Sequence, residues 1–407
     1  MLPVRYKLAS ENPLAGGRKL NLMDVVTFQK LLTTTGQSAL AAAAELGPTV
    51  AKYPAMVDRL RKHFADDLVR AALDTVLLRE KGAKKFSRGS EMYFTRETLE
   101  MATSESVARY RASRFAEFHS VADLCSGIGG DAIGLTLAGR SVTAVEREAL
   151  LLRMAEANLA VHGVSAQFIE GDVRTLPLTD VDAAFADPGR RRGEKRVLSV
   201  ENYDPPLGEL VGRFPLGFPM GVKLAPGAPR EDLARYDAVP EFIALDGELK
   251  ECCLWFGPLR PNRVTATVLP GPHQLQGDRN DLIPFGSMGH VIYDPNPAVS
   301  RSGLLAALAH TLNAHQFDPG VAFLTSNQLT TTPFATAYSV QEAFPFKPKL
   351  VGAWLREHGV GRITAVKRGT DVDTDALVKS WKLKGDEHRV AIITRNWVIV
   401  ATRFDGA

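Results

Sequence analysis

The sequence has few cysteines and lacks any long apolar run. Its 407 residues include three cysteines, Cys125, Cys252 and Cys253, with no C-x-x-C pair, so we expect neither a disulfide framework nor a structural zinc site. No stretch approaches the ~20 consecutive apolar residues of a membrane helix. The first residues, MLPVRYKLASENPLAGGRK, lack the apolar segment of a secretory signal. These absences predict a cytoplasmic protein that binds no metal and no membrane.

Neither sign of charge dominates the composition. The chain carries 49 Lys and Arg against 46 Asp and Glu, which gives a formal net charge of +3. This small excess does not predict nucleic-acid binding by the whole molecule, so any basic surface would have to be local. The hydrophobic fraction of 45% and the charged fraction of 23% are typical of globular proteins, and the length predicts two or three domains.

The first region, 1–117, has a helical pattern. Apolar residues recur at helical spacing from Asp24 to Leu32 and from Met56 to Leu78, so we expect a helix in each stretch. Thr95 is followed by Glu97, which is the chemistry of a helix start. We therefore predict an N-terminal helical region.

Strand and helix patterns alternate in the second region, 118–281. This alternation predicts βαβ units around a parallel, Rossmann-like sheet and places the chain in the α/β class. The expected strands are 120–124, 141–145, 166–169, 183–186, 220–224 and 241–245, and the expected helices are 132–137 and 149–162.

The third region, 282–407, predicts a separate α+β domain. A helix is expected over 302–312. Two strand patterns, 389–394 and 397–402, are separated by Arg395 and Asn396, which predicts a terminal hairpin.

A glycine-rich turn follows the first expected strand of the second region. It contains Cys125, Gly127 and Gly129 and runs directly into a helix pattern. Glycines let a ligand approach the backbone, and the first turn of a helix offers free N–H groups. The same residues also satisfy the G-x-G-x-x-A pattern of dinucleotide-binding oxidoreductases, and a tight turn without any ligand would look alike.

Acidic residues at consecutive strand ends favour S-adenosylmethionine (SAM) over a dinucleotide. Asp123 precedes the glycines, where it would repel a pyrophosphate but attract the ammonium and sulfonium of SAM. Glu146 ends the second strand, where a carboxylate can accept the ribose hydroxyls of either cofactor. Asp172 follows the third strand and can accept from the adenine amino group. The predicted cofactor site consists of Asp123, Cys125, Gly127, Gly129, Glu146, Arg147, Asp172, Val173 and Asp187.

The fourth strand is expected to end at Asp187-Pro188-Gly189-Arg190. Asp187-Pro188 resembles the Asp-Pro-Pro-Tyr motif of class I enzymes that methylate exocyclic amines, although Gly189 and Arg190 replace its second proline and its aromatic residue. We predict that Asp187 and the Pro188 carbonyl form the catalytic site by accepting the hydrogens of an amine.

Two further observations bear on the substrate. Methylation at carbon usually requires a cysteine nucleophile, whereas Cys252 and Cys253 lie in an apolar run typical of a protein core, so transfer to nitrogen or oxygen is favoured. Arg190 and Arg191 are candidates for binding a substrate phosphate, and a solvated basic loop is the alternative.

Several further motifs resemble a bacterial family of class I SAM-dependent methyltransferases that carry a C-terminal THUMP-like domain. The resemblance implies a Rossmann-like class I methyltransferase sheet between an N-terminal helical region and an α+β THUMP-like domain, with SAM as the cofactor. The motifs are Lys85-Phe86, 101–112, 187–191, Arg196-Val197, Asp204-Pro205, 223–227, 247–251, 293–298 and 366–369.

Because THUMP domains deliver RNA, chiefly tRNA, to modifying enzymes, the resemblance implies RNA as the partner. Together with the preference for transfer to nitrogen, it makes a base nitrogen of tRNA or rRNA the expected target. Basic residues enrich the tail after Lys347, with Trp354 and Trp381 between them, which suits phosphate contact and base stacking. Three alternatives stay open: a methyltransferase acting on a small molecule or protein, a non-catalytic RNA-binding protein with a SAM fold, and a dinucleotide oxidoreductase.

Overall fold

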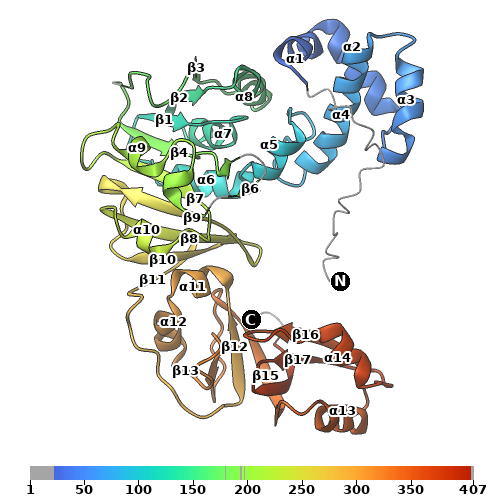
Figure 1. Ribbon diagram of the computed structural model, residues 1–407, viewed down its shortest axis with the longest axis vertical. Coiled ribbons are helices and arrows are strands. Elements are labelled where there is room, and N and C mark those ends of the chain that lie inside the picture. The colour runs from blue at the N-terminus through green and yellow to red at the C-terminus, as the bar shows by residue number, and fades with distance from the viewer. Residues whose placement is uncertain (1–22, 179, 193–194, 197, 405–407) are drawn as a thin grey trace.

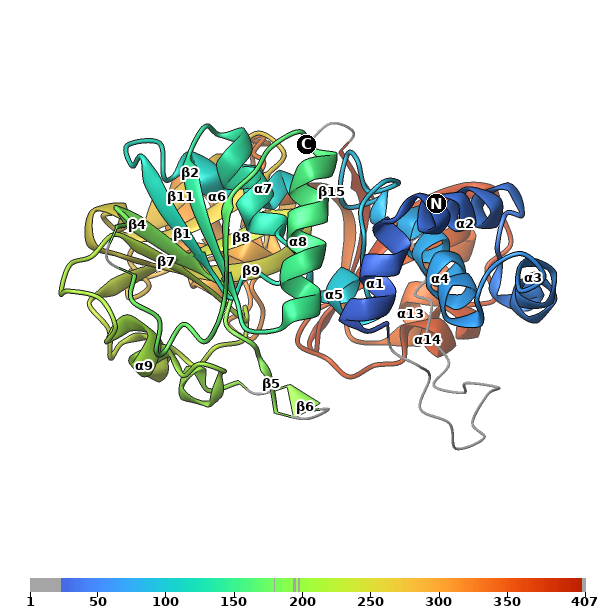
Figure 2. The same ribbon diagram turned by 90° about the horizontal axis from the view of Figure 1, so that it is seen from above.

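The computed structural model describes residues 23–178, 180–192, 195–196 and 198–404. Its elements form a set of N-terminal helices, a nine-stranded sheet and a seven-stranded sheet. The N-terminal helices and the C-terminal helices α13 (Pro348–Glu357) and α14 (Thr374–Ser380) project on the same side of the nine-stranded sheet (Figures 1 and 2).

The N-terminal helices begin at residues that satisfy free backbone N–H groups. Asp24 accepts from Thr27 N at 2.7 Å, and the Thr95 side chain accepts from Thr98 N, so the expected cap at Thr95 is present. The helices are α1 (Val25–Leu32), α2 (Thr34–Glu45), α3 (Tyr53–Leu60), α4 (Asp66–Gly82), α5 (Arg96–Met101) and α6 (Glu105–Ser113), with a 3₁₀ turn η1 (Val50–Lys52).

The single helix expected from Met56 to Leu78 is wrong, because the chain forms α3 and α4 with a break between them. Ala65 is extended (φ −62°, ψ 145°), and Asp66 and Asp67 occupy the first turn of α4, where the helix dipole favours negative charge. Both helices turn apolar residues into one buried cluster, so the apolar spacing continues across the break.

The nine-stranded sheet has the order β3-β2-β1-β4-β7-β9-β8-β10-β11. The strands from β3 to β7 are parallel, and β9 is antiparallel to both β7 and β8. A simple dinucleotide-binding sheet has no such antiparallel strand in this place. The strands are β1 (Ser120–Leu124), β2 (Ser141–Glu146), β3 (Gln167–Glu170), β4 (Ala183–Ala186), β7 (Met220–Leu224), β8 (Ala238–Leu245), β9 (Glu248–Phe256), β10 (Val264–Leu269) and β11 (His273–Gly277).

Helices and short elements connect these strands. The longer ones, α7 and α8, cover the positions where helices were expected. The connecting elements are α7 (Gly130–Leu137), α8 (Ala149–Val161), the hairpin β5 (Arg191–Arg192) and β6 (Lys195–Arg196), η2 (Val200–Asn202), α9 (Leu207–Val211), α10 (Arg230–Leu233) and η3 (Gly257–Leu259).

The sheet register brings the acidic strand ends together. Leu124 pairs with Val145 on one side and with Ala186 on the other. The next residues along these strands, Cys125, Glu146 and Asp187, therefore emerge at one edge of the sheet. In parallel sheets this carboxyl edge is where ligands bind.

The seven-stranded sheet has the order β13-β14-β12-β15-β18-β17-β16. The expected terminal hairpin is confirmed, because β17 and β18 pair antiparallel around Arg395 and Asn396. The expected helix over 302–312 is instead two helices separated at Gly303 and Leu304. The elements are β12 (Val291–Pro295), α11 (Pro297–Ser302), α12 (Leu305–Leu312), β13 (His315–Gln316), β14 (Leu324–Ser326), β15 (Ala335–Pro345), β16 (Val360–Lys367), β17 (Glu387–Ile393) and β18 (Trp397–Arg403).

Apolar packing joins the two sheets. Tyr293 of β12 and Leu308 of α12 are fully buried and belong to the same cluster as Val222 and Cys252 of the nine-stranded sheet. The last strands, β17 and β18, contribute to two separate clusters, one with β12 and residues 317–323 and the other with α13 and α14. The segment 291–337 therefore lies against the first sheet, and β15 connects it to the terminal strands.

No helix among the described residues is both long and apolar enough to cross a membrane. Within the same residues, no group of three His, Cys, Asp or Glu side chains is arranged to hold a metal ion.

Candidate active site

A pocket of about 900 Å³ opens at the carboxyl edge of the nine-stranded sheet. Its volume lies within the usual range for sites that hold a small-molecule cofactor. Of the predicted site residues, Asp123 and Gly129 do not line it. The predicted residues that line it are Cys125, Gly127, Glu146, Arg147, Asp172, Val173, Asp187, Pro188 and Arg190.

The turn from Cys125 to Gly129 adopts the left-handed backbone conformation three times, with φ of 59° at Cys125, 54° at Gly127 and 83° at Gly129. A methyl group at Gly127 would meet no other atom within 4 Å, so this glycine leaves space on the pocket side. A methyl group at Gly129 would lie 2.8 Å from Leu159 Cδ1 and 3.1 Å from Ala155 Cβ. Gly127 thus keeps the pocket wall open, whereas Gly129 allows the turn to pack closely on α8.

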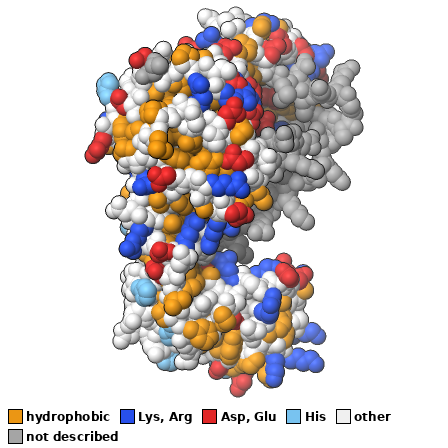
Figure 3. All heavy atoms as spheres, turned by 60° about the vertical axis from the view of Figure 1, so that its left-hand side comes forward, with side chains coloured by type: hydrophobic (Ala, Val, Ile, Leu, Met, Phe, Trp, Pro, Cys, Tyr) orange, Lys and Arg blue, Asp and Glu red, His pale blue; other side chains and the backbone are white. Residues whose placement is uncertain are grey.

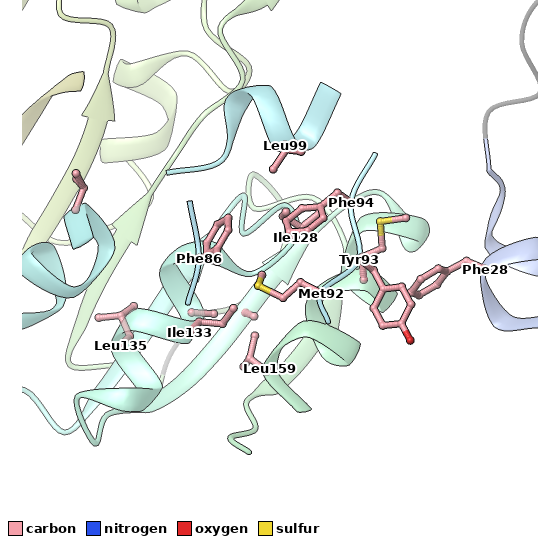
Figure 4. Packing of buried hydrophobic residues seen from close by; sticks show 14 of the residues in the cluster. Phe28, Phe86, Met92, Tyr93, Phe94, Leu99, Ile128, Ile133, Leu135 and Leu159 are labelled. Atoms are coloured by element: carbon pink, nitrogen blue, oxygen red, sulfur yellow. The ribbon is translucent and has the colours of Figure 1, made fainter. Parts of the chain in front are cut away.

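The segment 86–99 holds this turn from behind. Figure 4 shows Phe86, Met92 and Phe94 packed against Ile128, Ile133 and Leu159 of the turn and its flanking helices. The fully buried Asn158 of α8 donates to Ile128 O at 3.0 Å and to Tyr93 O at 3.1 Å, and accepts from Tyr93 N at 2.7 Å. The N-terminal region is therefore part of the framework of the site.

Glu146 fixes the turn from the end of β2. Its Oε2 accepts from Gly127 N at 2.9 Å, and its Oε1 accepts from Arg147 N at 2.9 Å and Glu148 N at 3.0 Å. Burial raises the pKa of Glu146, although these three N–H groups act in the opposite direction. The carboxylate is anchored and still borders the pocket.

Asp172 and Arg147 line the pocket, and each forms an ion pair with another residue. Arg174 Nε donates to both carboxylate oxygens of Asp172, at 2.9 and 3.0 Å, and lowers the pKa of Asp172 to about 2. Arg147 Nη1 donates to Asp204 Oδ2 at 2.7 Å, and Arg174 Nη1 lies 3.7 Å from Asp204 Oδ1. The sequence analysis predicted Asp172 as an acceptor for the adenine amino group but did not identify its ion-pair partner Arg174.

A group of charged residues lies next to the glycine turn, and two of them, Asp131 and Glu251, also line the pocket. Arg111 of α6 forms ion pairs with Asp131 and, at 2.9 Å, with Glu251. Neither oxygen of the buried Asp123 has a hydrogen-bond partner among the described residues. Burial and the neighbouring carboxylate of Asp131 raise the pKa of Asp123 well above its ordinary range, while Arg111 opposes this.

The end of β4 contains an ion pair that faces the pocket. Lys223 Nζ of β7 lies 2.6 Å from Asp187 Oδ2 and also donates to Thr103 Oγ1 at 2.9 Å. The Lys223 side chain is 5% exposed and that of Asp187 is 28% exposed. Asp187 is therefore held from inside the protein, while part of its carboxylate remains accessible.

Arg190 is half-buried and lines the pocket next to Asp187. Arg191 begins the short strand β5, and its side chain lies outside the part of the chain that the structure describes. Cys252 and Cys253 are fully buried in β9, as the sequence predicted for core residues.

Sequence reasoning gave no role to several polar residues of the pocket. Lys85, Thr103, Lys223 and Glu251 all lie in motifs that were noted only for their resemblance to the methyltransferase family. They come from four separate segments: Lys85 follows α4, Thr103 precedes α6, and Lys223 and Glu251 lie within β7 and β9. That these segments meet in one pocket could be seen only from the fold.

Comparison with known proteins agrees with this geometry. A THUMP domain-like family matches residues 335–403, and a domain family of unknown function matches residues 24–82. An uncharacterized S-adenosylmethionine-dependent methyltransferase of Mycobacterium tuberculosis is 32% identical over 334 residues, which covers 79% of this chain and 92% of the relative. A tRNA (uracil(54)-C(5))-methyltransferase of Pyrococcus furiosus is 26% identical over 140 residues, or 34% of each chain.

The fold is also shared with a solved structure. A protein of Porphyromonas gingivalis W83, solved as a candidate methyltransferase, superimposes with a TM-score of 0.75 at 18% identity and covers 94% of this chain and 100% of its own. The class defined by fold and site is that of class I methyltransferases. The chain belongs to the family of S-adenosylmethionine-dependent methyltransferases that includes the mycobacterial protein, and it carries a C-terminal THUMP-like domain.

The residues of the pocket fit the cofactor of this family. SAM carries an ammonium and a sulfonium, and the buried carboxyls of Asp123 and Asp131 have raised pKa values, which a bound cation would lower. The open space beside Gly127 gives a ligand access to the backbone. A pyrophosphate would meet unfavourable charge at the same position.

Proposed function

We propose that this methyltransferase modifies a base nitrogen of tRNA or rRNA. The observation that carries the proposal is the Lys223–Asp187 ion pair at the end of β4, beside Pro188 and within the pocket of a chain that also has a THUMP-like domain. The same chain therefore contains a carboxylate able to orient an amine and a type of domain associated with RNA.

We assign the cofactor to the glycine-turn side of the pocket. The turn at Cys125, Gly127 and Gly129 would lie against the cofactor, with Asp123 providing negative charge behind it. Glu146 and the adjacent Arg147 would border the ribose. Asp172 and Val173 would border the adenine, where Val173 is buried and supplies an apolar contact.

The chemistry asks the protein mainly for orientation. SAM supplies an electrophilic methyl group when bound. Asp187 Oδ1, which has no hydrogen-bond partner among the described residues, and the Pro188 carbonyl can accept the two hydrogens of an exocyclic amine and direct its lone pair toward the methyl group. Lys223 fixes the carboxylate through Oδ2, so Asp187 cannot rotate away from the amine.

The protonated thiol of the pocket cysteine favours transfer to nitrogen over transfer to carbon. Methylation at uracil C5 needs a thiolate nucleophile. Cys125 is the pocket cysteine among the described residues, and burial, with Glu146 and Asp187 nearby, raises its thiol pKa. A thiol in this environment stays protonated and is a poor nucleophile.

RNA as the substrate is supported by the C-terminal domain. Its exposed lysines, which include Lys347, Lys349, Lys379, Lys382 and Lys384, suit contact with phosphates. The expectation that Trp381 stacks on a base is wrong, because this side chain is 2% exposed and Nε1 donates to Pro348 O at 3.0 Å. Trp354 is half-buried and stacks on His358 at 3.8 Å between ring centroids.

The test is mass spectrometry of nucleosides from tRNA and rRNA of a strain that lacks the gene, compared with wild type. We expect one N-methylated nucleoside to disappear and to return when the wild-type gene is restored, but not with Asp187→Ala. Identical nucleoside profiles in the two strains would reject RNA as the substrate. They would favour a small molecule or protein instead.

A further inference from the structure

Three arginines meet where the nine-stranded sheet contacts α11. Arg230 begins α10, Arg279 follows β11, and Arg301 lies in α11. A methyl group added at Gly303 would lie 2.9 Å from Arg230 Nη2 and 3.4 Å from Arg279 Cγ, so both side chains pack over this glycine. Figure 3 shows Lys and Arg side chains gathered at the narrow part between the two lobes.

These arginines have no carboxylate partner in the described part of the chain. Arg279 Nε donates to Ser302 O at 2.8 Å, and Arg301 Nε donates to Pro226 O at 2.6 Å. Arg279 Nη2 is buried without a hydrogen-bond partner among the described residues. Burial and the like charges of Arg230 and Arg301 lower the pKa of Arg279. The Arg279 guanidinium also lies over the Phe242 ring, 5.4 Å from its centroid. Since no carboxylate among the described residues pairs with the three arginines, an anion would relieve their mutual repulsion.

The cluster lies directly beside the pocket wall. Pro226 and Gly227 line the pocket, and a methyl group at Gly227 would lie 3.9 Å from Arg301 Nη2. Arg301 thus contacts the same loop that borders the catalytic pocket. A group bound by the arginines would belong to a substrate that also reaches into this pocket.

We propose that Arg230, Arg279 and Arg301 form a phosphate-binding site for the RNA backbone next to the nucleotide that enters the pocket. This inference rests on the proposed RNA substrate. Guanidinium groups match phosphate oxygens through paired N–H donors. Three arginines that have no carboxylate partner within the described ranges therefore suit a phosphate group. The site fixes the position of the RNA on the enzyme without reading its sequence.

The test measures binding of labelled bulk tRNA and rRNA from the gene-deletion strain to the full-length protein as a function of salt. The variant combines Arg230→Gln with Arg301→Gln. Arg235→Gln is the matched control, because Arg235 is exposed and lies close in the chain but pairs with Asp232 at 3.5 Å. The double variant should bind RNA about tenfold more weakly, and its log–log salt slope should fall by about 2.

Three outcomes are distinguishable. Weaker RNA binding with a smaller salt slope, unchanged SAM binding by calorimetry and an unchanged melting temperature would support the inference, provided that Arg235→Gln binds like wild type. An unchanged slope and affinity in the double variant would overturn this inference alone. A wild-type protein that binds SAM but no RNA would overturn the proposed function and the inference together.

Discussion

Lys223 of β7 donates at 2.6 Å to Oδ2 of Asp187, the residue that directly follows the neighbouring strand β4. Because β4 and β7 are parallel neighbours in register, the lysine reaches the carboxylate from inside the sheet. Thr103 of the N-terminal region accepts from the same ammonium at 2.9 Å. One side chain thus connects the proposed acceptor site with the α5–α6 segment.

Replacing Lys223 with Met should lower the rate of methyl transfer by about 100-fold, since the Asp187 carboxylate loses the group that orients it. The SAM dissociation constant should change by less than about threefold, because the ion pair lies on the acceptor side of the pocket. Single-turnover kinetics and calorimetry measure the two effects. Lys30→Met, which removes an exposed ion pair between α1 and Asp67 of α4, is the control. Loss of SAM binding without loss of transfer rate would contradict this role.

Asp187→Asn and Lys223→Met should be strongly non-additive. Each single change breaks the same ion pair, so the double variant should be barely slower than Asp187→Asn alone. Rates for the four proteins of this double-mutant cycle provide the measurement. Independent, multiplying losses would show that Lys223 acts on something other than Asp187.

Two glycines with nearly equal backbone angles allow a matched comparison. Gly129 has φ 83° and faces Leu159 and Ala155 closely, whereas Gly139 has φ 80° and an added methyl group there would meet no atom within 4 Å. Gly139→Ala should cost about 1 kcal/mol of unfolding free energy from backbone strain. Gly129→Ala should cost about 2–4 kcal/mol, because overpacking adds to the strain, and should also weaken SAM binding. Equal losses in urea unfolding would refute the role assigned to close packing on α8.

Asn158→Ala should lower the free energy of unfolding by about 2–4 kcal/mol, since it leaves buried groups of Tyr93 and Ile128 without partners. Asn262→Ala, at an exposed position, should change it by less than about 0.5 kcal/mol. Urea denaturation of both variants provides the comparison. A loss at Asn158 as small as that at Asn262 would mean that this side chain does not hold the glycine turn.

SAM binding should become tighter as pH rises through the raised pKa of Asp123. Because the pKa of Asp123 is raised in the folded protein, its carboxyl favours the protonated form, and the folded protein loses stability relative to the unfolded chain as pH rises. A bound cation favours the charged carboxylate instead. Binding should therefore release protons, which calorimetry in buffers of different ionisation enthalpy can count. Asp123→Asn should remove that release. Proton uptake by wild type would contradict the electrostatic account.

The positions of several strands and of the cofactor turn could be predicted from the sequence because both depend on local signals. Short apolar runs bounded by turn residues located β1, β4 and β7 to the residue. The break between α3 and α4, residues 61–65, was missed because apolar spacing continues through it. It ends at the extended Ala65, directly before the first turn of α4.

The charge partners could not be predicted, because they come from distant parts of the chain. Lys223 lies 36 residues from Asp187, and Arg111 lies 140 residues from Glu251. Periodicity indicates that such residues are buried but gives no information on which of them meet. Trp381 was misassigned for a similar reason, since its burial depends on packing between α13, α14 and the terminal strands.

The most direct test of the account is methyl transfer by the purified full-length protein, with labelled SAM and RNA from the gene-deletion strain. The account predicts label on a base nitrogen of tRNA or rRNA with wild type, little transfer with Asp187→Ala, and unmodified acceptor sites only in RNA from the deletion strain. Label in small molecules or protein while RNA stays unlabelled, or label at a base carbon, would contradict it.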